Sequence, residues 1–545
     1  MNNPIKKLKS FLPAAVRYAL LFLAAGLVLF YHLGDRMLWG DEAETAVLAK
    51  NILQFGIPRT FDGVNHITLF GESVDGNEED VWTWSPWLDE YVAAASFALF
   101  GETTWAARFL FALVAWLSVI GLARMVYAIF ASHLLALLAA FLLASSELFL
   151  LHGRQCRYYA LIVAAQIVLM YGLYLLFRND RKSVWLVALA LLVQFYSNYI
   201  VVAANLPVLG LTALFHARKY SGLGRNIFTA GALFALLAAP WLLYAKPWLQ
   251  TQAIAGDDWL QKLLYYSVEI HFHIMPLFFF VLPLLWFCLQ RSRPLPQDVA
   301  PRSRKKKSGA EFTRDTARVS GVTDWENALL LFFPSFLLVV VVTPGAYLRY
   351  ILPLIPVSAI LMALWLVRLL HNRFLLAAAV LVLTMTNWLA VAGAFFLSHR
   401  HPARLTLPSV VHSVMHTYED RFESALTFLQ QNTQPGQSVY VCDPEFPLHF
   451  YTKLKIVDGR FYGNHLPEPL PDWILAQSLS GVIELPPLSL DAELASLYER
   501  IDLHLRDSRR GGTIPEPDIY EYLTAPGLKP LTIYKKLGVG PQPNQ

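Results

Sequence analysis

The chain has few charged residues and few cysteines for its 545 residues. Only 15% of the residues are charged, whereas 56% are apolar. This balance excludes a disordered chain and an ordinary soluble protein. The three cysteines, Cys156, Cys288 and Cys442, lie in different regions and have neither metal-ligand nor redox spacing. We therefore expect none of them to pair. The sequence also contains no Walker motif or other nucleotide-binding loop.

Long apolar runs occupy most of the chain instead. About eleven runs recur between residues 15 and 397, each of roughly 17 to 25 residues, the length that crosses a hydrocarbon core as a helix. The sequence therefore predicts an α-helical polytopic membrane protein. The predicted spans are 15–33, 107–130, 134–151, 158–177, 184–197, 199–215, 227–246, 270–289, 327–343, 347–369 and 374–397.

The stretch 184–215 has two interpretations. It is either two short spans joined by a tight turn at Tyr196-Ser197-Asn198, or one long helix that would reverse the orientation of everything after it. Lysine and arginine favour two spans, because these residues collect in short cytoplasmic loops. The amino terminus is then cytoplasmic and residues 34–106 lie outside. The loops that fall on the cytoplasmic side are all basic, and they are 178–182, 216–225, 290–326 and 368–373.

Two basic segments have alternative interpretations. The first span could be a cleaved signal peptide, but its apolar stretch is longer than usual and lacks a small-residue cleavage site. We favour a retained anchor. The basic loop 290–326 could suggest nuclear targeting or nucleic-acid binding. We favour a flexible cytoplasmic loop that touches anionic membrane lipids, and we expect no nucleic-acid partner.

Residues 398–545 have the composition of a separate soluble domain, which follows the membrane domain of residues 1–397. Helical and strand patterns alternate here, so we expect a small α/β sheet with parallel pairing. No motif in this region points to chemistry. The predicted elements are helices at 423–432 and 446–454, a turn at 435–436, and strands at 438–442 and 455–458.

Acidic residues stand just past the outer end of the first span, in the sequence Trp39-Gly40-Asp41-Glu42-Ala43-Glu44. Carboxylates so close to a bilayer are costly and often functional. Asp41 and Glu44 are three residues apart and share one face of a helix. We favour a functional role for Asp41 or Glu42, and helix capping or interfacial solvation for Glu44. The loop 34–106 is therefore predicted to be an acidic catalytic outer loop.

Three arginines lie on the same outer side, where positive charge is least expected. Arg154 and Arg157 occupy the short turn before the fourth span, and Arg349 stands between Tyr347 and Tyr350. Guanidinium groups bind phosphate through paired hydrogen bonds, so for Arg154 and Arg157 we favour a bound anion over pairing with the loop acids. The two tyrosines are either a lipid or sugar slot around the cation or an ordinary interfacial belt.

Glu269, His271 and His273 invite a metal-site interpretation. The spacing argues against it, because residues i and i+2 point to different sides of a helix. We favour interfacial or hydrogen-bonding roles and predict no metal ligands. Ligand spacing gives no support for a divalent cation or for any other cofactor.

Polar groups clustered at one membrane face fit an enzyme that takes a lipid-linked phosphate donor from the bilayer. A carboxylate would act as general base, and the lipid phosphate would leave. The alternatives are a transporter or flippase of lipid-linked sugars and a catalytically inactive scaffold. Transporters usually have paired inverted repeats and charges near the bilayer midplane. The sequence has neither feature.

The order of several motifs resembles the membrane-embedded C-type (GT-C) glycosyltransferases. Within these it is most similar to the protein mannosyltransferases and the lipid A aminoarabinose transferases, a family 39-like group. The motifs are Trp39-Gly40-Asp41-Glu42-Ala43, Ala49 to Gly56 with Pro58, Pro86 to Gly101, Ala106-Ala107-Arg108, and Arg349-Tyr350-Ile351-Leu352-Pro353 with Pro356.

The resemblance implies an inverting transferase that uses a dolichyl- or undecaprenyl-phosphate sugar. Asp41 would deprotonate or orient the acceptor, which is lipid A, another envelope glycan, a hopanoid-like lipid or a protein. The other implied site residues are Glu42 beside the base, Arg154, Arg157 and Arg349 at the donor phosphate, and Trp39, Tyr158, Tyr347 and Tyr350 lining the substrate. A bacterial inner membrane is expected, with the carboxyl-terminal domain in the periplasm.

Two positions depart from the pattern of these relatives. Ser85 stands before Pro86, where relatives commonly have Lys or His, so one expected phosphate contact is missing. Tyr158 and Tyr159 follow the arginine-rich turn, where many relatives have Asp. The resemblance therefore implies neither a two-carboxylate mechanism nor a metal.

Overall fold

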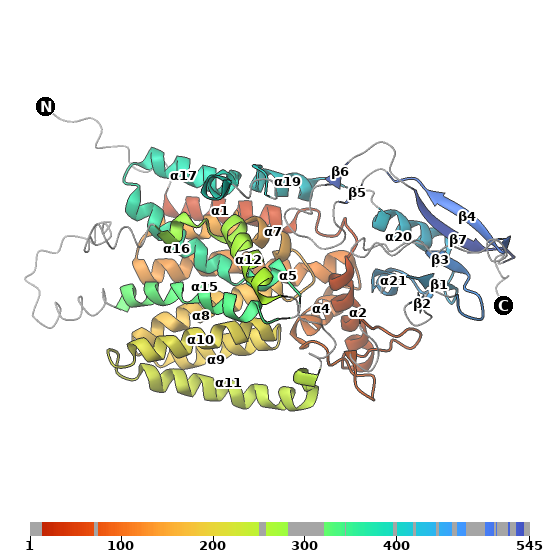
Figure 1. Cartoon of the computed structure of the whole chain (residues 1–545), viewed down its shortest axis with the longest axis horizontal. Helices are drawn as coiled ribbons and strands as arrows, with labels where there is room; N and C mark the ends of the chain where they lie inside the picture. Colours follow the sequence, from red (N-terminus) through yellow and green to blue (C-terminus); the bar gives the residue numbers. More distant parts are fainter. Residues whose placement is uncertain are drawn as a thin grey trace, which may run out of the picture.

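The structure is a computed structural model, in which long helices form a bundle and a small sheet lies at one end (Figure 1). It describes residues 13–69, 75–249, 258–281, 321–343, 345–395, 401–417, 421–442, 446–459, 466–475, 496–505, 508–509, 522–523 and 530–538. Most of the predicted basic loop 290–326 and Cys288 lie outside these residues. Cys156 and Cys442 are buried thiols.

The helices account for most of the described chain. They are α1 (Ala14–Phe30), α2 (Gly40–Phe55), α4 (Leu88–Phe100), α5 (Thr104–Phe130), α6 (His133–Ala144), α7 (Glu147–Gly153), α8 (Tyr159–Phe177), α9 (Lys182–Phe195), α10 (Tyr199–His216), α11 (Leu223–Ala245), α12 (Trp259–Glu269), η3 (Ile270–Ile274), α15 (Phe332–Val340), η4 (Leu348–Ile351), α16 (Leu354–Leu369), α17 (Arg373–Met385), α18 (Trp388–Gly393), α19 (Leu407–Met415), α20 (Arg421–Asn432) and α21 (Phe446–Tyr451).

Several helices have the length and composition of membrane spans. Five described helices qualify, namely α5, α8, α10, α11 and the helix Gly321–Val340 that contains α15. Helices α6 and α7 add a sixth span if they are counted together, although they are bent by 63°. Helices α1, α9, α16 and α17 are apolar but shorter. The chain is thus built as an integral membrane protein, and the total of eleven spans stays a prediction.

Two predicted spans are interrupted. The segment predicted to start a span at residue 270 begins with the π-helical turn η3 and then becomes extended at Met275. The last predicted span, 374–397, breaks after α17, where Thr386 pairs with Leu405 in an isolated antiparallel bridge. Asn387 donates to Pro402 O over 2.8 Å and accepts from Arg404 N over 2.8 Å. Polar partners from residues 402–405 therefore replace helical hydrogen bonds at this break.

The stretch 184–215 forms two helices, as the charge pattern predicted. Helix α9 ends at Phe195, and Asn198 caps α10 by accepting from Ile200 N over 2.9 Å. The turn lies against the start of α4, because Leu88 N donates to Tyr196 O over 3.0 Å.

The predicted basic loops meet one another at the far end of α9. Asn226 Nδ2 donates to Asn179 Oδ1 over 3.1 Å. Lys219 Nζ lies 2.5 Å from Asp324 Oδ2. Asn226 directly follows the predicted loop 216–225, so these segments share one end of the bundle, whereas the turn at residues 196–198 lies at the other end, against the start of α4. Which end faces the cytoplasm stays a prediction.

The sheet is mixed and has the strand order β2-β1-β3-β7-β4. The predicted parallel pair is confirmed, because β1 pairs in parallel with both β2 and β3. Strand β7 pairs antiparallel with β3 and β4. The strands are β1 (Ser438–Val441), β2 (Lys455–Asp458), β3 (Trp473–Leu475), β4 (Tyr498–Leu503) and β7 (Leu531–Lys536), with a separate pair β5 (Ser508–Arg509) and β6 (Tyr522–Leu523).

The C-terminal module, meaning the described residues between 421 and 538, is joined to the bundle by shared apolar side chains. Helices α20 and α21 lie between the sheet and α2 (Figure 1). Phe446 and Phe450 of α21 belong to the core of the helical bundle. In return, Met37 of the loop after α1 packs against the core of the module. The module therefore sits on the end of the bundle where α2 begins.

A buried cluster of three amides joins α8, α9 and α10. Gln194 Nε2 donates to Gln166 Oε1 over 3.0 Å, and Asn205 Nδ2 donates to both Gln166 Oε1 and Gln194 Oε1 over 2.9 Å. All three side chains are fully buried. Hydrogen bonds between spanning helices hold them together where lipid provides no hydrophobic driving force.

We predict that Gln166→Leu destabilises the bundle, because Gln166 accepts from both other amides. Losing these bonds should lower the free energy of unfolding by about 1–2 kcal/mol, seen as a lower midpoint of thermal unfolding in detergent. Leu214→Ala is the control, because Leu214 of α10 is 73% exposed on the outer surface. Equal midpoints for wild type and Gln166→Leu would contradict the role given to the cluster.

Candidate active site

Asp41 lies in the first turn of α2, one of two acidic residues there, where carboxylates stabilise the positive end of the helix dipole. Its Oδ2 lies 2.9 Å from Arg349 Nη1. The Asp41 side chain is 26% exposed, whereas those of Glu42 and Glu44 are 1% and 2% exposed. Asp41 is therefore the one of these three acids that a substrate can reach.

Arg157 connects the turn before α8 to the first turns of α2. Its Nη1 lies 2.7 Å from Glu44 Oε1 and donates to Thr45 Oγ1 over 2.7 Å. The same nitrogen lies 3.3 Å from the carbonyl oxygen of Asp41. The predicted alternative, pairing of this turn with the loop acids, is thus present at Arg157 through Glu44. Arg157 nevertheless contacts the backbone of Asp41, and Arg349 contacts its carboxylate.

Glu42 is held from several directions. Arg108 of α5 binds it with two hydrogen bonds, Nε to Oε1 over 2.7 Å and Nη2 to Oε2 over 2.6 Å. Cys156 N donates to Oε1 over 2.8 Å. Both carboxylate oxygens are therefore engaged, and Glu42 fixes the residue before Arg157 as well as its own neighbour Asp41. Glu42 is thus fully bound within the protein, whereas Asp41 is the accessible carboxylate.

Two further buried acids, Asp89 and Glu90, stand in the first turn of α4. Burial raises the pKa of Asp89, although the charge of Arg157 lowers it. Burial also raises the pKa of Glu90 well above its usual range, and the charge of Asp89 adds to the effect. Sequence reasoning missed this pair. The available signal was two adjacent acids that follow Pro86, Trp87 and Leu88, near the start of a helix in the acidic loop.

Ser85, the position that departs from the relatives, is bound within the same loop. Its Oγ accepts from Trp82 Nε1 over 2.8 Å and lies 3.4 Å from Glu90 Oε1. The residue therefore contributes a neutral hydroxyl beside a buried acid.

Aromatic rings surround the two arginines. The Arg349 guanidinium carbon lies 4.2 Å from the centre of the Tyr347 ring, and the rings of Tyr347 and Tyr350 are 5.6 Å apart. The Arg157 guanidinium carbon lies 5.6 Å from the centre of the Tyr158 ring. Trp39 is a buried residue immediately before α2. The predicted tyrosines thus lie beside the two arginines, and Trp39 lies at the start of α2.

Arg154 occupies a different place from the other two predicted arginines. Its guanidinium donates to the carbonyl oxygens of Val28 and, over 2.7 Å, Tyr31. These carbonyls end α1, where an arginine binds the unsatisfied oxygens and the negative end of the helix dipole. The structure therefore brings Asp41, Arg157 and Arg349 together and directs Arg154 to α1.

The histidine segment is used for hydrogen bonding, as predicted for His271. Its Nε2 lies 2.8 Å from Ala390 O, and its Nδ1 accepts from Leu277 N over 2.8 Å. His273 Nε2 lies 3.3 Å from Glu269 Oε2. Within the described ranges, no group of three His, Cys, Asp or Glu side chains is arranged to hold a metal ion.

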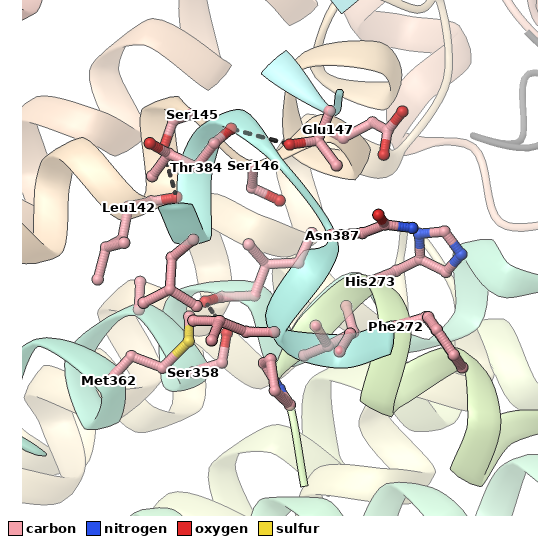
Figure 2. Close-up of a pocket in the computed structure, with 18 of the residues that line it drawn as sticks. Leu142, Ser145, Ser146, Glu147, Phe272, His273, Ser358, Met362, Thr384 and Asn387 are labelled. Carbon is pink, nitrogen blue, oxygen red and sulfur yellow. Dashed lines mark hydrogen bonds between the residues drawn. The ribbon is translucent and has the colours of Figure 1, made fainter. Parts of the chain in front are cut away.

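A cavity of about 90 Å³ lies apart from Asp41, where three helices are interrupted. Figure 2 shows Ser145, Ser146 and Glu147 at the break between α6 and α7, with Phe272 and His273 of η3 across from them. Several polar side chains in its wall have hydrogen-bond or ion-pair partners within the protein. Ser358 Oγ donates to Ile355 O over 2.8 Å and Thr384 Oγ1 to Val380 O over 2.9 Å, and Arg404 holds Glu147 with two contacts of 2.7 and 2.8 Å.

These features define a class of protein: a many-helix membrane protein with an acid and arginine site where the bundle meets a C-terminal module. Residues 85–244 match the family described as dolichyl-phosphate-mannose-protein mannosyltransferase. The predicted resemblance is thereby confirmed at the level of a family match over this segment. No curated protein sequence is significantly similar to the chain.

The fold is similar to that of two solved structures of a particular protein. The structure is similar to ArnT from Cupriavidus metallidurans bound to undecaprenyl phosphate, with a TM-score of 0.54 and 15% identity over 97% of this chain and 100% of that one. It is also similar to ArnT from the same organism in the apo state, with a TM-score of 0.51 and 14% identity over 83% and 88% of the two chains. The C-type fold expected from the sequence is thus confirmed.

We predict that Glu42→Gln destabilises the protein. The substitution preserves shape but leaves the buried Arg108 cation without its counter-ion, which typically costs about 3–5 kcal/mol. The midpoint of thermal unfolding should fall clearly below that of wild type. Glu79→Gln is the matched control, because Glu79 is an exposed acid of the same loop. A Glu42→Gln midpoint equal to the control would show that the pair does not hold the loop.

We also predict a pH-dependent contribution from Glu44. Burial raises the pKa of its carboxyl to about 7, the charges of Asp41 and Asp75 add to this, and Arg157 opposes it. Folded Glu44 therefore binds its proton more tightly than the unfolded chain does. The resulting stability is complete below about pH 4.5, the usual carboxyl range, and is lost as the pH rises through 7.

Glu44→Gln lacks this loss. The free energy of unfolding of the variant, relative to that of wild type, should therefore rise between pH 5 and pH 8 by at most about 3 kcal/mol. Thermal unfolding at several pH values measures the difference. A difference that does not change with pH would contradict the raised pKa.

Proposed function

We propose that the chain transfers a sugar from a polyprenyl-phosphate donor, of the undecaprenyl-phosphate kind, to an envelope acceptor at the outer face of the membrane. The acceptor is lipid A, another glycolipid or glycan, or a protein. The observation that carries the proposal is the accessible Asp41 carboxylate, which lies 2.9 Å from Arg349 and has Arg157 at its backbone carbonyl. A base and two cations at one point suit attack by a hydroxyl and departure of a phosphate.

The reaction is a single displacement. Asp41 accepts the proton of the acceptor hydroxyl as its oxygen attacks the anomeric carbon of the sugar. The bond between this carbon and the phosphate oxygen breaks, and the electron pair leaves with the polyprenyl phosphate. Because the acceptor attacks opposite to the leaving group, the configuration at the anomeric carbon inverts.

Arg157 and Arg349 serve the leaving phosphate. Negative charge grows on the phosphate oxygen as the glycosidic bond breaks, and guanidinium groups fixed nearby stabilise that charge. Both arginines are held in advance, Arg157 by Glu44 and Arg349 by Asp41. Glu42 positions the base, and Trp39, Tyr158, Tyr347 and Tyr350 line the space for the substrates.

Similar proteins support the donor class. The family that matches residues 85–244 is described by dolichyl-phosphate-mannose, and one solved ArnT structure contains undecaprenyl phosphate. Both compounds are polyprenyl phosphates. Such donors reach an enzyme from within the bilayer, which suits a site on a bundle of membrane-spanning helices.

The orientation follows from charge. Lysine- and arginine-rich loops gather at the end of the bundle remote from Asp41, and such loops favour the cytoplasm. We therefore place the amino terminus in the cytoplasm of a bacterial cell, and Asp41 and the C-terminal module in the periplasm. A flippase would instead be expected to carry charges near the bilayer midplane, whereas the proposed substrate contacts lie at one end of the bundle.

The test compares envelope lipids from cells that lack the gene and from cells that express wild type, Asp41→Asn or the control Glu79→Gln. Loss of a general base lowers rates by about 10²- to 10⁴-fold. We expect mass spectra to show a glycosylated species with wild type and Glu79→Gln, and its unglycosylated acceptor with Asp41→Asn and the null. The mass difference identifies the sugar.

Protein levels of the variants are matched by immunoblotting before the spectra are compared. A product restored fully by Asp41→Asn would remove Asp41 as the base. Spectra that are identical in the null and in wild type would remove the transferase proposal itself.

A further inference from the structure

The loop of residues 33–38 connects α1 to α2 and ends three residues before Asp41. Its backbone forms hydrogen bonds on two sides, and each side belongs to a different part of the chain. Buried backbone groups need such partners, because an unpaired one is costly. The partners of this loop therefore decide where the base is held.

The helical bundle binds the carbonyl oxygens of the loop. Arg108 Nη1 donates to Leu33 O over 3.0 Å and to Arg36 O over 2.8 Å. Arg108 Nη2 donates to Met37 O over 3.1 Å. One side chain of α5 thus fixes three carbonyl groups while it also binds Glu42.

The C-terminal module binds the amide groups of the same loop. Met37 N donates to Glu423 Oε1 of α20 over 2.9 Å. Leu38 N donates to the hydroxyl of Tyr451, at the end of α21, over 2.8 Å. The Tyr451 hydroxyl also lies 2.8 Å from Thr104 Oγ1 at the start of α5. The amides on one side of the loop and the carbonyls on the other are therefore held by separate elements.

A second attachment lies farther along the same outer loop. Asn65 Nδ2 donates to Leu454 O over 2.9 Å, and Asn65 Oδ1 accepts from Ile456 N over 2.8 Å. The Lys50 ammonium of α2 lies 5.2 Å from the centre of the Phe450 ring. The module is thus fixed to both ends of the segment that contains α2.

We infer that the C-terminal module is part of the catalytic site, with Glu423 and Tyr451 acting as positioning residues that hold residues 37 and 38 and thereby Asp41. The inference rests on the proposed transferase function. It assigns no contact with substrate to either residue. Their effect is on the geometry of the base, so it should appear in the turnover rate rather than in the affinity for the donor.

The variants are Tyr451→Phe, which removes only a hydroxyl, and Glu423→Ala, which removes the acceptor of Met37 N. Glu423→Gln is the rescue variant, because its amide oxygen can still accept. Tyr498→Phe is the control for removal of a hydroxyl inside the module, where Tyr498 donates to Pro471 O over 2.8 Å, away from the loop. All variants are made in the full chain and purified in detergent.

Two measurements are made on each variant. The first is sugar transfer from an undecaprenyl-phosphate sugar, with kcat and KM determined separately. The second is hydrogen exchange of the peptide that covers residues 36–44, with a peptide of α8 as reference. Exchange reports on the loop whether or not transfer occurs.

We expect Tyr451→Phe and Glu423→Ala each to lower kcat by about tenfold, the effect of one misplaced hydrogen bond, with KM within about twofold of wild type. Exchange in residues 36–44 should be about tenfold faster, and the α8 peptide should not change. Glu423→Gln and Tyr498→Phe should behave like wild type in both measurements.

The inference is overturned if Tyr451→Phe and Glu423→Ala exchange and turn over like wild type. It is also overturned if both measurements change equally in Tyr498→Phe, since the module would then act only through general stability. A wild-type protein without transfer activity defeats the proposed function. Faster exchange confined to residues 36–44 would, in that case, still establish that the module holds the loop.

Discussion

Glu42 and Arg108 form an ion pair almost entirely out of water, and such a pair is tolerated only when the remaining donors and acceptors also have partners. Here Arg108 donates to three loop carbonyls, and Glu42 accepts from Cys156 N. One pair thus joins α5, the start of α2 and the turn before α8. Asp41 is adjacent to Glu42, and Arg157 follows Cys156, whose amide Glu42 binds, so the pair fixes the backbone on both sides of the candidate site.

Charge in the site is arranged so that acids outnumber cations around Arg157. Glu44, Asp89 and Glu90 are buried near it, and burial raises the pKa of each carboxyl. A raised pKa lets a buried carboxyl keep its proton to higher pH, so less net negative charge surrounds Arg157. Asp41 is partly exposed and lies beside Arg349. The same cluster therefore contains one accessible carboxylate among acids that burial keeps weak.

The sequence predicted the features that depend on length, charge and spacing. Loop charges predicted that α9 and α10 are separate helices. The alternation of helical and strand patterns after residue 397 predicted β1 and β2. Arg157 and Arg349 were predicted on the same outer face as Asp41, as ligands of a bound phosphate, because cations are least expected on that side. Arg154 also lies on this side of the sequence, but it binds carbonyl oxygens at the end of α1. No local sequence pattern predicts that contact. Asp89 and Glu90 were missed because two acids in a loop helix look like a solvated face. The break at Thr386 depends on contacts with residues 402–405. These residues lie outside the apolar run that predicted the span, so the run itself does not indicate a break.

The attachment of Asn65 to β2 has a consequence for assembly. Strand β2 ends the order β2-β1-β3-β7-β4, and the outward-facing amide and carbonyl of its free side are groups that could pair with another chain. Asn65 donates to Leu454 O and accepts from Ile456 N on that side. One side chain thus forms the two hydrogen bonds that a neighbouring strand would form with these groups. The protein's own loop therefore competes with strand addition at this edge, and two copies of the chain could join their sheets there only after Asn65 is displaced.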